Sequence, residues 1–410
     1  MSEAPITIIE LGDVIIKCII FNIDSNDDVE ILSVSSVPSD GIKNGVIINL
    51  SKASNTIRSC ISIAEKQTKI ILKKVNVVFE QSDFLCTKFS KHKKISGSKI
   101  YKEDIEFLLK EGKKQIILND KNQTIIHIFN YNYNVDGKKF IKEPIGVYAN
   151  FLKHEMTFVT APKNNLKNIK QAFIDCDIEI ERMISKTFAL GVKLLKYDEL
   201  ENGCALIDLG YENTSLGLFK NLALSNSITI PIGMNHITKD ISKVCSLNLE
   251  ESETIRNNID FSLNNKQNIF NEENFLKNIY FINSNIRKIS KSLILDVIKA
   301  RLDEIFAKIK KQIKAGGLNF NPQIKLFLSD GSSDLLNLEK YCEIFFETSV
   351  KKIEDKNIFK TQNDLEKNLS ACRGGIKIIK DGWETEAIPI TSKKNTENKG
   401  FFRRIFGNVT

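Results

Sequence analysis

The sequence lacks the features that would place it in a membrane or outside the cell. No window approaches the roughly 18 consecutive apolar residues that a membrane-spanning helix needs. The start, Met1-Ser2-Glu3-Ala4-Pro5, lacks the basic residues and the apolar run of a signal peptide. These absences argue against a helical membrane protein and against a secreted one. We therefore expect a soluble body in the cytoplasm.

The sequence also lacks a disulfide framework and a metal motif. Its cysteines occur singly, with no C-x-x-C pair and no histidine at the spacing of metal ligands. We therefore expect buried free thiols and no metal centre. The eight cysteines are Cys18, Cys60, Cys86, Cys176, Cys204, Cys245, Cys342 and Cys372.

What the chain does contain is an ordinary globular balance. Of its 410 residues, 42% are hydrophobic and 27% are charged, which is enough for a large core and about two or three domains. The net charge of +8 accompanies a general enrichment in lysine, asparagine and isoleucine, so composition explains most of it. No basic face interleaved with aromatic residues is present, and we expect no nucleic-acid partner.

Two similar strand-loop-strand segments occur in the chain. Residues 7–12 have the pattern of a buried strand ending in an acid and a glycine, and residues 15–21 that of the strand returning beside it. Residues 205–210 and 215–219 repeat this arrangement. A third buried strand at 324–328 precedes the small-residue loop Ser329-Asp330-Gly331-Ser332-Ser333 and a helix expected from about Leu335.

Such loops suit phosphate binding. A glycine just after a strand lets backbone amides approach a phosphate, and a nearby carboxylate can hold Mg²⁺ through water. One loop alone is most often a plain hairpin, whereas two related copies and a third loop favour a two-lobed α/β protein with a nucleotide cleft. The candidate nucleotide-binding residues are Glu10, Gly12, Asp208, Gly210, Thr214, Gly331 and Ser332.

Several motifs resemble one known family over nearly the whole chain. The most specific are residues 126–137 and 141–147, which resemble the H-x-x-P-x-x-Y-x-V-D-G … I-x-x-P-x-G segment of the bacterial cell-division protein FtsA, an actin-like protein. Taken alone, this stretch predicts a β-hairpin with a turn at Asp136-Gly137. Residues 43–50 with the helix after them, and residues 230–241, are similar to two further FtsA motifs.

A long helix is expected around residues 300–305, which resemble the family's A-R-x-x-E-I stretch. Arg301 lies beside the apolar stripe of this helix, where a plain surface charge and a binding residue are both open interpretations. The stripe repeats at intervals of three and four and consists of Ile294, Val297, Ile298, Leu302, Ile305, Ile309 and Ile313.

The resemblance implies an actin-like fold in two lobes with a small inserted subdomain. The first lobe would comprise residues 1–83 and 164–202 with a closing segment at 373–390, and the inserted subdomain residues 84–163. The second lobe would comprise residues 203–234 and 316–372, with 235–315 as its upper subdomain. A flexible linker at 391–399 and a membrane-targeting helix at 400–410 would follow.

The pattern of residues 400–409 is that of an amphipathic anchor. In a helix, its apolar side chains share one face and its two arginines face away. A helix this short rarely persists alone in water, so it would fold on meeting a surface. The alternative is that this tail docks on the protein itself, but residues 391–399 hold no apolar position and look like a tether. The proposed membrane-binding residues are Phe401, Phe402, Arg403, Arg404, Ile405, Phe406 and Val409.

We expect no enzymatic activity, because the phosphate loops depart from those of the family. The resemblance implies a cell-division protein. It would attach filaments of the tubulin-like division protein FtsZ to the inner face of the cytoplasmic membrane at the division site. The implied partners are the FtsZ C-terminal tail, anionic lipid, other copies of the chain in actin-like filaments, and later division proteins. Arg287, Lys288 and Arg301 are candidates to bind the acidic FtsZ tail. Two alternatives stay open, an active actin-fold ATPase or sugar kinase and an actin-like scaffold of pilus or shape machinery.

The phosphate loops depart from the family pattern. Residues 10–16 read E-L-G-D-V-I-I where the family has approximately D-I-G-T-T-K-V, so its lysine is missing and Asp13 takes a hydroxyl position. Tyr211 and Glu212 replace glycines of the second loop, and S-D-G-S-S at 329–333 replaces T-G-G-G-S. ATP with Mg²⁺ is the cofactor that the resemblance implies. The added carboxylates and side chains predict weak or absent ATP binding and no hydrolysis.

Overall fold

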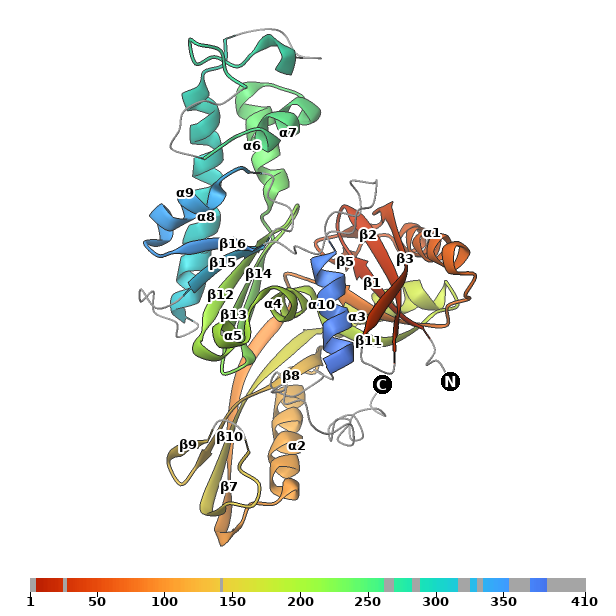
Figure 1. Ribbon diagram of the computed structural model, residues 1–410, viewed down its shortest axis with the longest axis vertical. Coiled ribbons are helices and arrows are strands. Elements are labelled where there is room, and N and C mark those ends of the chain that lie inside the picture. Colours follow the sequence, from red (N-terminus) through yellow and green to blue (C-terminus); the bar gives the residue numbers. More distant parts are fainter. Residues whose placement is uncertain are drawn as a thin grey trace. The chain divides into compact units, whose positions relative to one another are not determined.

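A computed structural model describes most of the chain, and its described part forms two compact units (Figure 1). The first contains the described residues of Met1–Gly203, Gly217–Ile228 and Asp355–Thr410, and the second those of Cys204–Leu216 and Thr229–Glu354. No described helix is long and apolar enough to cross a membrane. The described residues are 5–24, 28–140, 143–261, 269–281, 288–315, 325–329, 335–353 and 369–381.

A five-stranded mixed sheet lies at the centre of the first unit. Its strands have the order β11-β6-β1-β2-β3. β1 and β2 run antiparallel with Glu10 opposite Lys17, whereas β6 is parallel to both β1 and β11. The strand pair predicted at residues 7–12 and 15–21 is therefore confirmed. The bounds are β1 Ile6–Leu11, β2 Ile15–Ile23, β3 Val29–Pro38, β6 Lys74–Phe79 and β11 Glu179–Ser185.

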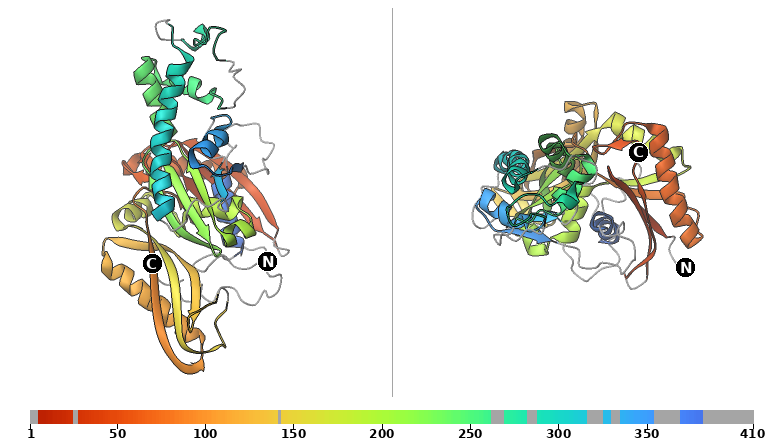
Figure 2. Two further views of the ribbon diagram at one scale, coloured as in Figure 1. Left: turned by 90° about the vertical axis from the view of Figure 1, so that its left-hand side faces the viewer. Right: turned by 90° about the horizontal axis from the view of Figure 1, so that it is seen from above.

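Helices cover both faces of this sheet (Figure 2). α1 (Leu50–Thr68) packs with α3 (Lys163–Ile174), and α10 (Ser370–Asp381) packs with α4 (Lys186–Leu194) on the other side. α1 begins where the Asn49 side chain accepts a hydrogen bond from the Lys52 amide, which caps the helix. The smaller elements of this unit are β4 Ile42–Lys43, β5 Val46–Ile47 and α5 Tyr197–Asn202.

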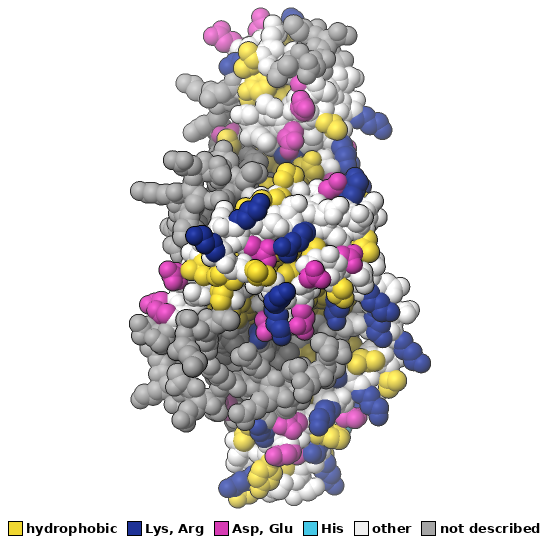
Figure 3. Space-filling model, turned by 90° about the vertical axis from the view of Figure 1, so that its right-hand side faces the viewer, with side chains coloured by type: hydrophobic (Ala, Val, Ile, Leu, Met, Phe, Trp, Pro, Cys, Tyr) yellow, Lys and Arg dark blue, Asp and Glu magenta, His cyan; other side chains and the backbone are white. Residues whose placement is uncertain are grey.

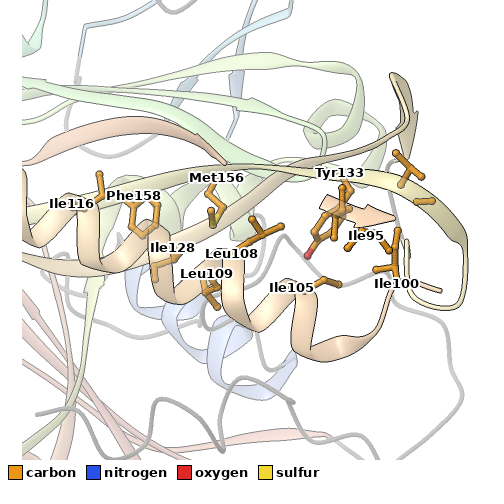
Figure 4. Packing of buried hydrophobic residues seen from close by; sticks show 13 residues of the cluster. Ile95, Ile100, Ile105, Leu108, Leu109, Ile116, Ile128, Tyr133, Met156 and Phe158 are labelled. Carbon is orange, nitrogen blue, oxygen red and sulfur yellow. The ribbon is translucent and has the colours of Figure 1, made fainter. Parts of the chain in front are cut away.

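Residues 85–162 form a second sheet with a single helix on one face. The strands β7 (Leu85–Lys99), β8 (Gln123–Val135), β9 (Lys138–Phe140) and β10 (Tyr148–Pro162) are antiparallel, in the order β7-β10-β8-β9. Figure 4 shows how side chains of α2 (Lys102–Asn119), such as Leu108 and Ile116, pack against Met156 and Phe158 of β10. The predicted hairpin is confirmed, because Asp136 and Gly137 have φ of 47° and 81°, as a two-residue turn requires.

A buried polar cluster joins this second sheet to the rest of the first unit. The Ser185 hydroxyl donates to the Glu80 carboxylate at 3.0 Å, and the Thr187 amide donates to it at 2.8 Å. The Ser185 amide donates to Nε2 of His127 at 2.9 Å. Burial lowers the pKa of His127 to about 4, which keeps the ring neutral and able to accept this bond.

The second unit combines parallel strands with a set of helices. β12 (Cys204–Leu209) is parallel to β15 (Lys325–Ser329), which is parallel to β16 (Val350–Ile353), within the sheet order β14-β13-β12-β15-β16. The helix predicted around Arg301 is confirmed as α8 (Lys291–Ala315), whose apolar stripe is buried except for the half-buried Val297. The other elements of this unit are α6 Met234–Cys245, α7 Leu249–Asn257, η1 Asn278–Tyr280 and α9 Leu338–Phe346. The remaining strands of the sheet are β13 Thr214–Lys220 and β14 Ala223–Ile230, whose residues Gly217–Ile228 belong to the first unit.

All eight cysteines are free thiols. Seven are buried, as predicted, and Cys86 is partly exposed. Burial raises the pKa of Cys60 to about 11, so this thiol remains protonated at neutral pH. The residue bounds expected from the sequence for the lobes and subdomains stay a prediction.

Acidification should destabilise the sheet of residues 85–162 through its buried histidines. The pKa of His127 falls from about 6.5 in an unfolded chain to about 4, so its contribution is fully present above pH 6.5 and is lost towards pH 4. We expect this one group to remove about 2 kcal/mol between pH 7.5 and pH 5. Buried His154, whose pKa burial lowers to about 3, acts in the same direction.

Pulse proteolysis over a urea series, with peptides from residues 85–162 quantified by mass spectrometry, measures this effect. His127→Gln keeps an acceptor for the Ser185 amide and removes the titration, so its stability should depend less on pH. Carboxylates titrate alike in both proteins, and the comparison isolates the histidine. The same pH dependence in both would contradict the assignment.

Candidate functional site

The first candidate phosphate loop follows β1. Gly12 has no room for a side chain, because a Cβ there would lie 2.4 Å from the carbonyl oxygen of Ile15. The Asp13 carboxylate accepts a hydrogen bond from the Gly45 amide at 2.9 Å. Gly45 lies in the turn between β4 and β5, where its φ is 67°. Asp13 therefore joins the loop to this turn.

Glu10, the candidate nucleotide-binding acid before this loop, is buried and engaged within the first unit. Its carboxylate lies 3.5 Å from the Lys17 ammonium on the neighbouring strand and 3.7 Å from Cys372 Sγ on α10. Burial raises the pKa of the Cys372 thiol well above its usual range, and the charge of Glu10 adds to that rise. In this structure the charge of Glu10 is balanced by Lys17.

The second candidate loop follows β12 and begins at a buried acid. Asp208 is 5% exposed and accepts a hydrogen bond from the Ser329 hydroxyl at the end of β15. The two groups meet because β12 and β15 are parallel, with Ile207 opposite Leu328. Gly331 and Ser332, predicted to complete the site from the third loop, lie outside the described residues.

Loop residues 210–213 are held tightly by the start of α6. The amides of Met234 and Asn235 donate to the carbonyls of Gly210 and Tyr211 at 2.9 and 2.8 Å. A Cβ on Gly233 would lie 2.5 Å from both of these carbonyl oxygens, so only glycine fits there. These two amides at the helix N-terminus therefore serve the loop itself, although such amides commonly bind anions.

The residues that replace the family's loop glycines also have partners. The Glu212 carboxylate accepts a hydrogen bond from the Asn235 side chain at 2.6 Å. Partial burial raises the pKa of Tyr211, and the charges of Glu253 and Glu212 add to the rise. Thr214, predicted to bind nucleotide, is fully buried and donates its hydroxyl to the carbonyl of Ile232 at 2.7 Å. Thr214 therefore holds the loop through its bond to Ile232.

Arg301, the candidate for binding an acidic tail, joins two helices. Its Nε and Nη2 atoms lie 2.6 and 3.0 Å from the two carboxylate oxygens of Asp240 on α6. Its Nη1 lies 2.5 Å from Glu304 on its own helix. Two carboxylates therefore already neutralise this guanidinium.

Of the two predicted cations that the structure describes, Lys288 is more exposed than Arg301. Its side chain is 78% exposed and lies 4.0 Å from Glu273. Its ammonium also stands over the ring of Phe275, 5.2 Å from the centroid. Arg287 and the membrane-binding residues at 401–409 lie outside the described residues.

The sequence did not reveal Arg256, which holds α6 and α7 together. Arg256 is 2% exposed and donates to the Met234 carbonyl at 3.1 Å and to the Thr238 hydroxyl at 2.6 Å. Its place within the polar stretch of residues 249–257 gave no signal.

In the described part of the chain, no group of three or more histidine, cysteine or acidic side chains is placed to hold a metal ion.

Known proteins resemble this chain in sequence and in fold. The family described as "SHS2 domain inserted in FTSA" matches residues 84–160, and "Cell division protein FtsA" matches residues 205–370. FtsA of Agrobacterium fabrum (strain C58) is 24% identical over 349 residues, which cover 81% of this chain and 77% of the relative. FtsA of Buchnera aphidicola subsp. Schizaphis graminum is 26% identical over 381 residues, covering 89% and 88%.

Among solved structures, one titled "PilM-PilN type IV pilus biogenesis complex" has a TM-score of 0.61 with this chain. It is 11% identical and covers 92% of this chain and 98% of its own. At that identity the likeness shows the fold alone. With the family matches, it confirms the predicted actin-like α/β fold with an inserted subdomain.

Reversing the charge of Arg301 should destabilise the second unit, because Arg301→Glu places a third carboxylate beside Asp240 and Glu304. We expect a loss on the order of 2 kcal/mol in the free energy of opening α6, as for a broken bidentate pair with added repulsion. Hydrogen exchange of the α6 amides measures it. Adding Asp240→Arg should restore most of the loss, and Lys311→Glu, an exposed change on the same helix, should have little effect. If the swap restores nothing, the ion pair does not join these helices.

Proposed function

Because the chain belongs to the FtsA family of bacterial cell-division proteins, we propose that it attaches FtsZ filaments to the inner face of the cytoplasmic membrane at the division site. The observation that carries this proposal is the pair of family matches, which together cover the inserted subdomain and residues 205–370. Self-association into actin-like filaments and contacts with later division proteins belong to the same proposal. A pilus scaffold is the weaker candidate, since its support is a shared fold at 11% identity.

Membrane attachment would come from residues 400–410. Burying three phenylalanines and an isoleucine supplies a salt-resistant contribution, because apolar area leaves water. The five basic residues of the tail each add on the order of 1 kcal/mol near anionic lipid. They are Lys393, Lys394, Lys399, Arg403 and Arg404.

Replacing Phe402 and Phe406 by glutamate should release the protein from anionic liposomes, because a charge would then enter the acyl boundary. Flotation on a density gradient measures the bound fraction. As a control, Phe402→Leu with Phe406→Leu keeps the apolar face and should float like the parent. A glutamate variant that still floats would show that the anchor lies elsewhere.

The acidic tail of FtsZ would bind the upper subdomain at residues 235–315. Lys288 supports this through its exposure, whereas Arg301 is neutralised by Asp240 and Glu304. Charge complementarity of this kind contributes specificity and association rate more than affinity.

Lys288→Glu should weaken binding of a peptide with the FtsZ C-terminal sequence by about twofold to fivefold, the usual scale for one exposed ionic contact. Fluorescence anisotropy with the labelled peptide at low salt gives the affinity. Lys311→Glu changes the net charge equally on the same subdomain and is the matched control. Equal affinities for both variants would exclude Lys288 from the contact.

ATP would bind weakly or not at all. In the first loop Asp13 takes a hydroxyl position and the lysine is absent, and in the second Tyr211 and Glu212 occupy glycine positions. A carboxylate about 4 Å from a phosphate costs about 4 kcal/mol per charge pair at an effective dielectric constant of about 20. The phosphate also cannot approach the loop backbone closely where a side chain replaces glycine. These residues therefore fit the nucleotide poorly.

Calorimetric titration with Mg-ATP should give no saturable binding below about 1 mM, which corresponds to about 4 kcal/mol of binding free energy. The variant Asp13→Thr with Tyr211→Gly and Glu212→Gly restores the family's residue types and should bind more tightly than the parent. Micromolar affinity of the unaltered chain would overturn the inference.

A further inference from the structure

The positive charge of the chain is concentrated in its inserted subdomain. Residues 84–160 hold 14 lysines and 8 acidic residues, a net charge of +6 out of +8 for the chain. Figure 3 shows lysine and arginine side chains spread over the lower part of one face, where this subdomain lies in Figure 1. The inserted subdomain therefore differs from the rest of the chain in net charge, although lysine is common throughout.

Five of these lysines lie on β7, a strand at the edge of its sheet. β7 runs from Leu85 to Lys99 without an acidic residue or a proline, and β10 is its one neighbour in the sheet. Between Lys88 and Lys99, Ile95 is the only buried residue of this described strand. An edge strand of this length presents a row of backbone amides and carbonyls to any extended chain.

The charges of β7 flank its open edge on both faces of the sheet. Ile95 packs in the cluster under α2, so Lys93 and Lys91 lie on the α2 face by alternation. Lys93 accordingly pairs with Asp104 of α2 at 2.7 Å. His92 and Lys94 then project from the opposite face, where Lys94 lies across from the half-exposed Phe151.

We propose that β7 binds an acidic, extended peptide segment of a partner protein by strand addition. Side chains of an added strand alternate between the two faces, so acidic residues on both faces would meet lysines on both. A membrane surface is flat and would reach one face alone. A second copy of β7 carries the same charges and would be repelled. The interaction goes beyond the proposed attachment of FtsZ and does not depend on it.

The simplest competing explanation for these lysines is that they protect the edge of the sheet. Lysines on an edge strand commonly prevent sheets from pairing edge to edge, and they then bind nothing. Binding by charge alone is another, since a basic surface attracts any acidic peptide without pairing its backbone. The experiment therefore has to separate charge from strand pairing.

Two labelled probes make this separation, each about ten residues long, the usual upper length of a strand. One repeats Glu-Glu-Val, which places glutamates on both faces of a strand. The other repeats Glu-Glu-Pro, which has equal charge but cannot pair along an edge because proline lacks an amide hydrogen. We expect the full-length protein to bind the valine probe at least about tenfold more tightly and hydrogen exchange to slow within residues 88–94.

Variants of the full chain locate the contact. Lys91→Glu with Lys94→Glu should weaken the valine probe at least about tenfold, since two contacts become repulsive. Lys110→Glu with Lys114→Glu changes the charge equally on the exposed side of α2 and should change affinity by less than about threefold. Equal binding of both probes, equal losses in both variants, or no binding at all would each overturn the proposal. If the variant Lys91→Glu with Lys94→Glu lost binding to anionic vesicles but bound the valine probe like the parent, the lysines would bind lipid. That result would overturn the proposal as well.

Discussion

A buried contact among Glu80, Ser185 and His127 ties the inserted subdomain to the central sheet. Glu80 directly follows β6, Ser185 is the last residue of β11 and the cap of α4, and His127 belongs to β8. Leaving one of these buried groups without its partner would cost about 1–3 kcal/mol. The contact therefore ties β8 of the antiparallel sheet to the ends of β6 and β11 in the central one. The amino-acid pattern that distinguishes the family includes this same His127, whose role in the structure is to hold the insertion in place.

In the second unit, the predicted phosphate loop after β12 and the predicted partner-binding residue Arg301 both take part in the framework. Gly233 lets α6 approach the loop after β12, and the amides of Met234 and Asn235 satisfy the loop carbonyls. Asp240 of α6 then pairs with Arg301 of α8. Loop, α6 and α8 thus form one hydrogen-bonded assembly. Residues of the predicted phosphate loop thus help to hold the fold of the second unit together.

Local patterns in the sequence predicted local structure well. The turn at Asp136-Gly137 and the apolar stripe of α8 needed only residues close in the chain, and both are confirmed. Partners distant in the chain could not be predicted. Asp13 meets Gly45 from 32 residues away, and Arg301 meets Asp240 from 61, which no periodicity encodes. The pair of Glu10 and Lys17 is intermediate, because the hairpin register places them opposite once the turn is known.

The proposed link between filament and membrane is tested most directly with three components. FtsZ filaments, anionic liposomes and the full-length protein are mixed without added nucleotide and separated by flotation. The account predicts that FtsZ rises with the liposomes when the protein is present and stays behind when it is omitted. FtsZ remaining in the lower fraction while the protein itself floats would contradict the link.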